Sequence, residues 1–278
     1  MSYYAPLGGY PQFDRSKSGP VPWGAGGRSQ VCFGEGVLPD LVRGLQELPA
    51  LAAEGMPLKA AARPTVIGCV FRLTSSEVVD ALLALDCCIV VDRQQKQREP
   101  LERLNRYGQP LSALGLPGFE ELGLPGLDGG APLIGPGSPI PGITELGPVR
   151  AAGWSPSRSS PPLVHVKMLL AGRAWVWEDD WGREQSHFTA LRTWLGSANW
   201  TAAAKMHLEF GLWSDDPDLL AANQTFLLDV LRFSQPFDSA TAGPAPELVD
   251  VDWDDDAFAE YVAEMGYPDG DDPQVDEK

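Results

Sequence analysis

The chain has 278 residues, a hydrophobic content of 44% and a formal net charge of −17 at pH 7. This length supports one main hydrophobic core with room for tails. No apolar run is long enough to span a bilayer, and the start of the chain lacks the basic and apolar regions of a signal peptide, so a membrane or exported protein is not expected. The 30 glycines and 26 prolines exceed average usage and predict irregular segments.

Cysteine usage points to a reducing compartment. The four cysteines, Cys32, Cys69, Cys87 and Cys88, show neither CxxC spacing nor the density of a disulfide scaffold. We therefore expect buried free thiols, a cytoplasmic location and no cysteine metal site.

The negative charge is concentrated at one end of the chain. Thirteen acidic residues lie between Glu247 and Glu277, and Lys278 is the only base after residue 243. The tail therefore carries −12 of the total −17, which leaves −5 for the rest. A mildly acidic domain can still carry a local basic groove, so the net charge does not exclude a nucleic-acid partner.

The N-terminal half predicts an α/β arrangement. Residues 1–30 read as a disordered tail and residues 31–62 as a helical cap, with helical apolar spacing over 37–54. The apolar run 64–73 predicts a strand, 74–86 an amphipathic helix that begins at Thr74 or Ser75, and 87–92 a second strand. Strand, helix and strand with short connections form a βαβ unit, so a parallel pair is expected.

The second half predicts further strands around a long loop. Residues 93–109 read as a charged surface helix, and 110–162 as a Pro/Gly-rich loop with one short strand near Gly147 to Ala151. Strands are expected over 163–172, 192–201 and 206–216, followed by a helix over 216–236. The main domain then spans 63–238 and an acidic tail spans 239–278.

Polar side chains recur in order on these expected strands. Alternation over 163–172 places His165 and Lys167 on one face, and the stretch 195–211, LGSANWTAAAKMHLEFG, contains Gly196, Ser197, Asn199 and Glu209. Each short pattern is common alone, but the combination resembles the phospholipase D superfamily, the HKD phosphodiesterases. The resemblance spans about residues 64–235.

The resemblance implies a fold and a chemistry. The fold is a phospholipase D-like mixed β-sheet flanked by helices, here with an N-terminal helical addition and disordered tails. His165 corresponds to a nucleophile that forms a phosphohistidine, while Lys167, Asn199 and the Ser197 hydroxyl hold the phosphate oxygens without a metal or cofactor. Gly196 lets the backbone approach the phosphate.

The remaining roles of the family imply a second copy of the chain. Glu209 corresponds to a carboxylate that hydrogen-bonds a motif histidine. A second histidine must protonate the leaving oxygen, and His187 and His207 lack the x-Lys partner. The resemblance therefore implies a homodimer in which the two His165 side chains face each other.

The sequence departs from the family pattern at two places. The family has an aspartate five residues after the lysine, where this chain has Gly172. Residues 173–192 form an insert with three tryptophans, which could line or cover the groove and stack on bases or could simply pack a hairpin.

The function expected from the resemblance is a metal-independent nuclease that uses a phosphohistidine, and the resemblance also suggests an effector of phage defence or restriction. Two alternatives remain: a degenerate, non-catalytic HKD scaffold that binds nucleic acid or a protein complex, and a phospholipid-cleaving enzyme. Expected partners are nucleic acid, a second copy and, through the acidic tail, a larger protein complex, with no membrane. The aromatic residues of that tail, including Trp253 and Phe258, could bind a partner or fold back over the groove.

Overall fold

The computed structural model describes residues 29–56, 62–93, 95, 97–112, 115–117, 145–152, 164–178 and 184–237. The expected disordered tail up to residue 28, the acidic tail at 239–278 and most of the Pro/Gly-rich loop lie outside the described residues. No helix in the described part of the chain combines the length and apolarity needed to cross a bilayer.

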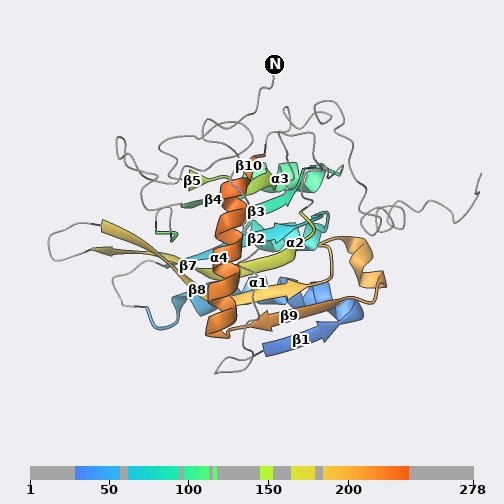
Figure 1. The fold of residues 1–278 in the computed structure, drawn as a ribbon, viewed down its shortest axis with the longest axis horizontal. Helices are drawn as coiled ribbons and strands as arrows, with labels where there is room; N and C mark the ends of the chain where they lie inside the picture. The colour runs from blue at the N-terminus through green and yellow to red at the C-terminus, as the bar shows by residue number, and fades with distance from the viewer. Residues whose placement is uncertain are drawn as a thin grey trace, which may run out of the picture.

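Ten strands form one mixed sheet in the order β1-β9-β8-β7-β2-β3-β4-β5, with β6 beside β3 and β10 beside β6 (Figure 1). The strands are β1 (Ser29–Phe33), β2 (Ala62–Val70), β3 (Asp86–Asp92), β4 (Gln109–Ser112), β5 (Glu145–Leu146), β6 (Val149–Ala152), β7 (Lys167–Glu178), β8 (Glu184–Gly196), β9 (Phe210–Ser214) and β10 (Gln235–Pro236). Strand β3 pairs in parallel with β2, β4 and β6, and the other pairs are antiparallel.

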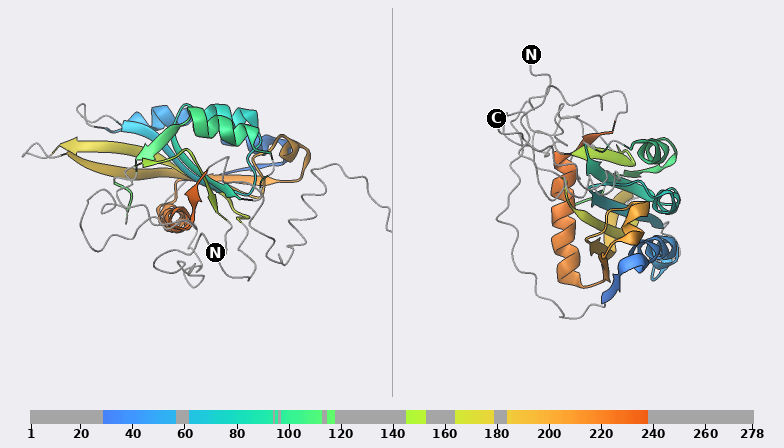
Figure 2. Two further views of the ribbon diagram at one scale, coloured as in Figure 1. Left: turned by 90° about the horizontal axis from the view of Figure 1, so that it is seen from above. Right: turned by 90° about the vertical axis from the view of Figure 1, so that its right-hand side faces the viewer.

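Helices cover both faces of the sheet. They are α1 (Val37–Ala53), α2 (Ser76–Leu82), α3 (Glu99–Tyr107) and α4 (Pro217–Phe233), with short 3-10 turns η2 (Gly34–Gly36) and η3 (Ala202–Met206). Helices α1, α2 and α3 lie on one face and α4 on the other (Figure 2). The predicted architecture, a mixed β-sheet flanked by helices, is confirmed.

The predicted βαβ unit is β2, α2 and β3. Both strands are apolar along most of their length and buried on both faces, as expected for parallel strands covered by helices. Ser75 caps α2 by accepting a hydrogen bond from the amide of Val78 at 3.4 Å, and Asp216 caps α4 by accepting from Leu219 N at 3.0 Å. Both caps were expected from the sequence.

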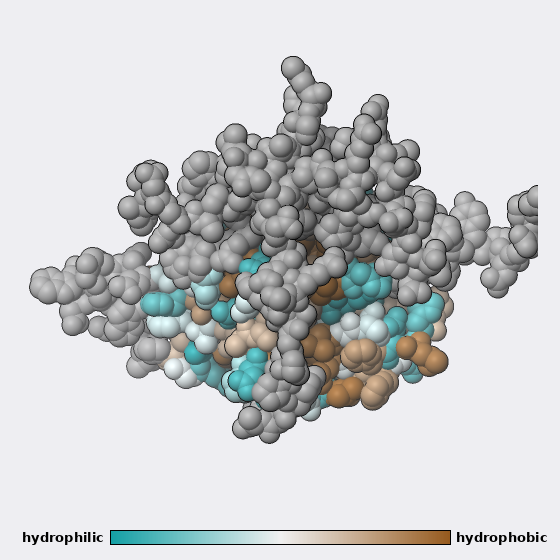
Figure 3. Space-filling view, in the orientation of Figure 1, coloured by the Kyte–Doolittle hydropathy of each residue, from teal (hydrophilic) through white to brown (hydrophobic). Residues whose placement is uncertain are grey.

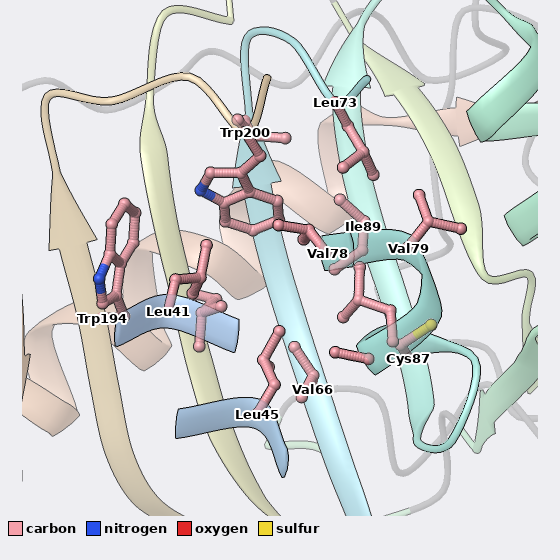
Figure 4. Packing of buried hydrophobic residues seen from close by; sticks show 14 of the residues in the cluster. Leu41, Leu45, Val66, Leu73, Val78, Val79, Cys87, Ile89, Trp194 and Trp200 are labelled. Atoms are coloured by element: carbon pink, nitrogen blue, oxygen red, sulfur yellow. The ribbon is translucent and has the colours of Figure 1, made fainter. Parts of the chain in front are cut away.

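The main core lies between the sheet and helices α1 and α2. Trp194 and Trp200 meet edge to face with ring centroids 6.1 Å apart, and both are fully buried. Leu41 and Leu45 of α1 and Val78 of α2 pack in the same cluster (Figure 4). The strand ends that carry the polar motif are therefore anchored by large buried side chains.

The N-terminal region is more than a helical cap. A helix within residues 31–62 is present as α1, but Ser29–Phe33 form strand β1, which the sequence analysis did not predict. β1 pairs antiparallel with β9, with Phe33 opposite Phe210. The segment was missed because five residues without clear apolar alternation give little signal, and the pairing with β9 is long-range.

The described residues of the insert 173–192 lie away from the end of the sheet that carries His165. Its described residues lengthen β7 and β8 into a hairpin that extends away from the end of the sheet where His165 and Ser197 lie (Figure 1). At about 3.3 Å per residue, the far end of β7 lies roughly 36 Å from its start. Trp175 stacks on His187 at 4.5 Å and donates to Thr189 Oγ1 at 3.0 Å, so it packs within the hairpin. Residues 179–183, including Trp181, lie outside the described residues.

Candidate active site

The two polar side chains of the first motif are in direct contact. Lys167 Nζ lies 3.0 Å from His165 Nε2 and 3.5 Å from the His165 carbonyl oxygen. An ammonium group has three donors and no lone pair, so the contact with Nε2 is a hydrogen bond only when Nε2 accepts it. The geometry therefore fits a neutral imidazole with its proton on Nδ1 and a lone pair on Nε2. Such a nitrogen is a nucleophile.

Burial separates the roles of these two side chains. Lys167 is 7% exposed, whereas His165 lies on the surface. A buried ammonium is held in one place by its surroundings, while an exposed imidazole can meet a substrate. The pair therefore combines a fixed positive charge with an accessible nucleophile.

The end of β2 positions this pair. Val70 is opposite Lys167 in the sheet, and Phe71 N donates to Val166 O at 3.1 Å. The Phe71 ring meets His165 edge to face at 5.1 Å, and Lys167 Nζ lies 5.8 Å from the ring centroid. Phe71 was not predicted as a site residue, although its place directly after a buried strand was a signal.

The second motif lies at the same end of the sheet. Leu195, the residue before Gly196, is opposite Met168, so the turn after β8 comes close to the start of β7. Trp200 N donates to Arg72 O at 3.0 Å, and Trp200 O accepts from Thr74 N at 2.9 Å. These bonds attach the turn to the end of β2.

Asn199 and Gly196 are fixed within this turn. Asn199 is 1% exposed and lies between the anchored Trp200 and the end of β8. A Cβ at Gly196 would lie 2.4 Å from Phe210 O. Position 196 therefore requires glycine because β9 packs closely against it. This requirement adds to the close approach of the backbone to a phosphate that the resemblance implies.

Ser197 and Glu209 form a pair that the resemblance did not predict. The Ser197 hydroxyl donates to the Glu209 carboxylate and accepts from Phe210 N at 3.0 Å. The Ser197 amide also donates to Phe210 O at 3.1 Å. The resemblance implied that Glu209 bonds a motif histidine, whereas within one chain its carboxylate bonds Ser197. Glu209 therefore holds the turn against β9.

Two further side chains shape the loops around His165. Asp92, at the end of β3, accepts from Val164 N at 3.0 Å through Oδ2 and fixes the approach to β7. The Gln95 side chain accepts from Leu73 N at 3.0 Å and donates to Leu73 O at 2.8 Å, which holds the chain after β2. Asp92 could have been predicted from its position at the carboxyl end of a parallel strand, because ligands of α/β folds bind at these strand ends.

Gly172 lies in β7 at a shift of register with β8, opposite Thr65 of β2. A Cβ there would lie 2.4 Å from Thr189 O. The position that holds an aspartate in the family pattern thus has no room for a side chain. The described residues also contain no group of three or more His, Cys, Asp or Glu side chains that could hold a metal ion.

Three of the four thiols are fully buried. Burial raises the pKa of Cys69 and of Cys87 far above the usual range and raises that of Cys88 to about 12. Burial and the neighbouring Asp40 raise the pKa of Cys32. All four cysteines are free; Cys69, Cys87 and Cys88 are buried as expected, whereas Cys32 is only partly buried.

Comparison with known proteins gives matches in structure alone. No family model matches the chain, and no curated protein matches it in sequence. NucT from Helicobacter pylori has 13% identity and a TM-score of 0.45, covering 76% of this chain and 100% of NucT. Nuc from Salmonella typhimurium, a phospholipase D family member, has 16% identity and a TM-score of 0.43, covering 77% of this chain and 100% of Nuc.

A polyphosphate kinase from Porphyromonas gingivalis has 13% identity and a TM-score of 0.40, covering 76% of this chain and 27% of that one. The structure is thus similar to that of a phospholipase D family member, the superfamily that the motif resembles. With TM-scores below 0.5, none of these similarities carries a functional conclusion. That conclusion depends on the site itself.

Proposed function

We propose that the chain is a metal-independent phosphodiesterase that cleaves nucleic acid through a phosphohistidine on His165. The observation that carries the proposal is the contact of Lys167 Nζ with His165 Nε2. It lies at the end of the sheet where the Gly196–Thr201 turn also lies. Phosphoryl transfer needs a nucleophilic lone pair, and it needs a cation and polar groups that stabilise the charge on the phosphate oxygens.

The first step is attack of the Nε2 lone pair of His165 on phosphorus. A P–N bond forms, the P–O bond to the leaving group breaks, and the leaving oxygen takes a proton. Lys167 transfers its hydrogen bond from Nε2 to a non-bridging phosphate oxygen and stabilises the charge of the transition state. In the second step water attacks phosphorus, the P–N bond breaks and restores neutral His165, and the water proton returns to the group that protonated the leaving oxygen.

The proton for the leaving oxygen requires another histidine. His187 is stacked in the hairpin, on the opposite side of the fold from His165. We therefore propose a two-fold dimer in which His165 of a second copy donates this proton. A cytoplasmic location, which the cysteine usage favours, and a place among the effectors of phage defence or restriction, which the family resemblance implies, are part of the same proposal.

The test is cleavage of single- and double-stranded DNA and RNA in EDTA, with the molecular mass measured in the same buffer. We expect EDTA-resistant cleavage by a dimer, lost in His165→Ala and retained in the matched control His187→Ala. Wild-type chains mixed with an excess of His165→Ala chains should lose activity per wild-type chain, because a mixed dimer has only one of the two His165 side chains; unchanged activity per wild-type chain would refute the shared site. Cleavage that needs a divalent metal, or that survives in His165→Ala, would refute the proposal. A dimer that binds these nucleic acids and cleaves none would favour the non-catalytic scaffold.

A further inference from the structure

The side chain of Gln95 takes the place of a strand beside Leu73. β2 pairs with β3 as far as Val70 and Val91, and the buried Leu73 lies past the end of this pairing. Gln95 Oε1 accepts from Leu73 N at 3.0 Å, and Gln95 Nε2 donates to Leu73 O at 2.8 Å. Because a buried amide or carbonyl left unpaired is costly, this one side chain completes the pairing of Leu73.

The Gln95 amide is held in one orientation. Nε2 uses its second hydrogen to donate to Gln97 O at 2.8 Å, and the backbone amide of Gln95 donates to Asp92 O at 3.2 Å. A side-chain amide has two donor hydrogens, so both are used within the protein. The Asp92–Gln95 turn after β3 is therefore closed by its own backbone and tied to the chain after β2.

Leu73 passes this tie on to the second motif. Leu73 and Trp200 form a parallel bridge, in which Trp200 N donates to Arg72 O at 3.0 Å and Thr74 N donates to Trp200 O at 2.9 Å (Figure 4). Asn199 directly precedes Trp200 and is almost completely buried. A shift of Trp200 would therefore move Asn199 with it.

The same turn also reaches the first motif. Asp92 Oδ2 accepts from Val164 N at 3.0 Å, and Val164 directly precedes His165. Asp92 and Gln95 are the two ends of the turn. One short segment after β3 thus holds the backbone before His165 at one end and, through Leu73, the Gly196–Thr201 turn at the other.

We propose that Gln95 is a positioning residue that fixes the Gly196–Thr201 turn at the end of the sheet that carries the His165–Lys167 pair. The surface at this end, at the right of Figure 3, has hydrophilic and hydrophobic residues side by side. Gln95 is only 8% exposed, so it acts through Leu73 and Trp200 and not by contact with a substrate. The consequence for catalysis rests on the proposed function, whereas the positioning does not.

The experiment uses Gln95→Glu and follows the backbone amide of Trp200 and the side-chain amide of Asn199 by NMR. A protonated carboxyl can still accept from Leu73 N and donate to Leu73 O, whereas an ionised one has no donor and faces two carbonyl oxygens. Burial and these oxygens should raise the pKa of the new carboxyl above its usual range. Over a range of about pH 5 to 9, we expect wild-type positions of both signals at the acidic end and displaced signals at the alkaline end.

Two comparisons isolate the side chain at position 95. Wild type has the same neighbouring titratable groups, Asp92 and His165, and the same arginines after β2 and β3. A pH dependence seen in the variant alone therefore comes from the new carboxyl. The matched control is Gln97→Glu, which makes the same change on an exposed side chain and keeps the carbonyl that accepts from Gln95. It should leave both signals at their wild-type positions.

Gln95→Leu removes the amide at every pH. We expect kcat on nucleic acid to fall about tenfold or more with KM changed less than about threefold, because a displaced turn weakens contacts made in the transition state. The amide signal of Thr189, in the distant hairpin, should keep its wild-type position and show that the variant is folded. A general loss of stability would not produce this split between kcat and KM.

The outcomes separate the positioning role from the proposed function. Signals of Trp200 and Asn199 that Gln95→Glu leaves at their wild-type positions over the whole pH range would overturn the positioning role. An active enzyme whose kcat Gln95→Leu leaves unchanged would also overturn it. A wild-type protein that cleaves no nucleic acid, together with the expected displacement in Gln95→Glu, would refute the proposed function and leave the positioning role intact.

Discussion

The ring of Phe71 meets the imidazole of His165 edge to face, with centroids 5.1 Å apart and an interplanar angle of 60°. The same ring lies 5.8 Å from Lys167 Nζ and 5.1 Å from the centre of the Arg72 guanidinium. One aromatic side chain thus contacts the proposed nucleophile and two cations. Phe71 is a positioning residue for His165.

We predict that Phe71→Leu lowers kcat on nucleic acid about three- to tenfold with little change in KM, while Phe71→Tyr stays close to wild type. An aromatic pair contributes about 0.5–1.5 kcal/mol beyond burial, which corresponds to rate factors of this size. The measurement is steady-state kinetics together with an NMR titration of the His165 ring. If leucine and tyrosine variants gave equal kcat values and unchanged His165 chemical shifts, the positioning role would be wrong.

Ser197 and Glu209 should behave as one unit. The Ser197 hydroxyl joins the Glu209 carboxylate to the amide of Phe210, so removal of either side chain releases the turn from β9. We expect Ser197→Ala, Glu209→Gln and the double variant to lose similar activity, with a coupling energy of about 0.5–3 kcal/mol in a double-mutant cycle. Additive losses would mean that the two side chains act separately.

Gly172→Asp should damage the fold. A Cβ at this position lies 2.4 Å from a backbone oxygen, so the aspartate of the family pattern cannot be accommodated without moving β8. We predict a loss of about 1–3 kcal/mol in the free energy of unfolding, measured by urea denaturation, and no gain in activity. The matched control is Gly36→Ala, where a Cβ meets nothing within 4 Å. A Gly172→Asp variant that is stable and more active would contradict this prediction, because it would show that an aspartate fits at this position and improves the site.

The thiols should be nearly inert in the native protein. Because burial raises the pKa values of Cys69, Cys87 and Cys88, the reactive thiolate is scarce at pH 8. Cys32 is only partly buried, so we expect slow labelling there alone, with a rate that rises with pH between 7 and 9 because its pKa is also raised. Four thiols should react in denaturant. Rapid native labelling of two or more would contradict the described packing.

Local patterns in the sequence predicted much of the fold. The βαβ unit and the caps at Ser75 and Asp216 depend on short-range periodicity and on side chains that bond nearby amides, so they could be read directly. Strand β1 could not, because its partner β9 lies about 180 residues away along the chain. The insert was ambiguous because a two-stranded hairpin and a loop over the groove have similar compositions.

Only part of the candidate site could be predicted, because short motifs are visible in the sequence and contacts between distant strands are not. The motif identified His165, Lys167 and the Gly196–Asn199 turn, and the structure brings them to one end of the sheet. Phe71 and the bonding of Glu209 to Ser197 depend on how separate strands meet in space, which spacing along the chain does not encode.

The most direct test of the account is to trap the covalent intermediate. Wild-type protein is mixed with an oligonucleotide in EDTA, quenched at alkaline pH, where phosphohistidine persists, and digested for mass spectrometry. We predict a phosphoryl-nucleotide adduct on the peptide that contains His165, absent in His165→Ala and present in His187→Ala. Turnover without an adduct, or an adduct on another residue, would contradict the central claim that His165 is the nucleophile.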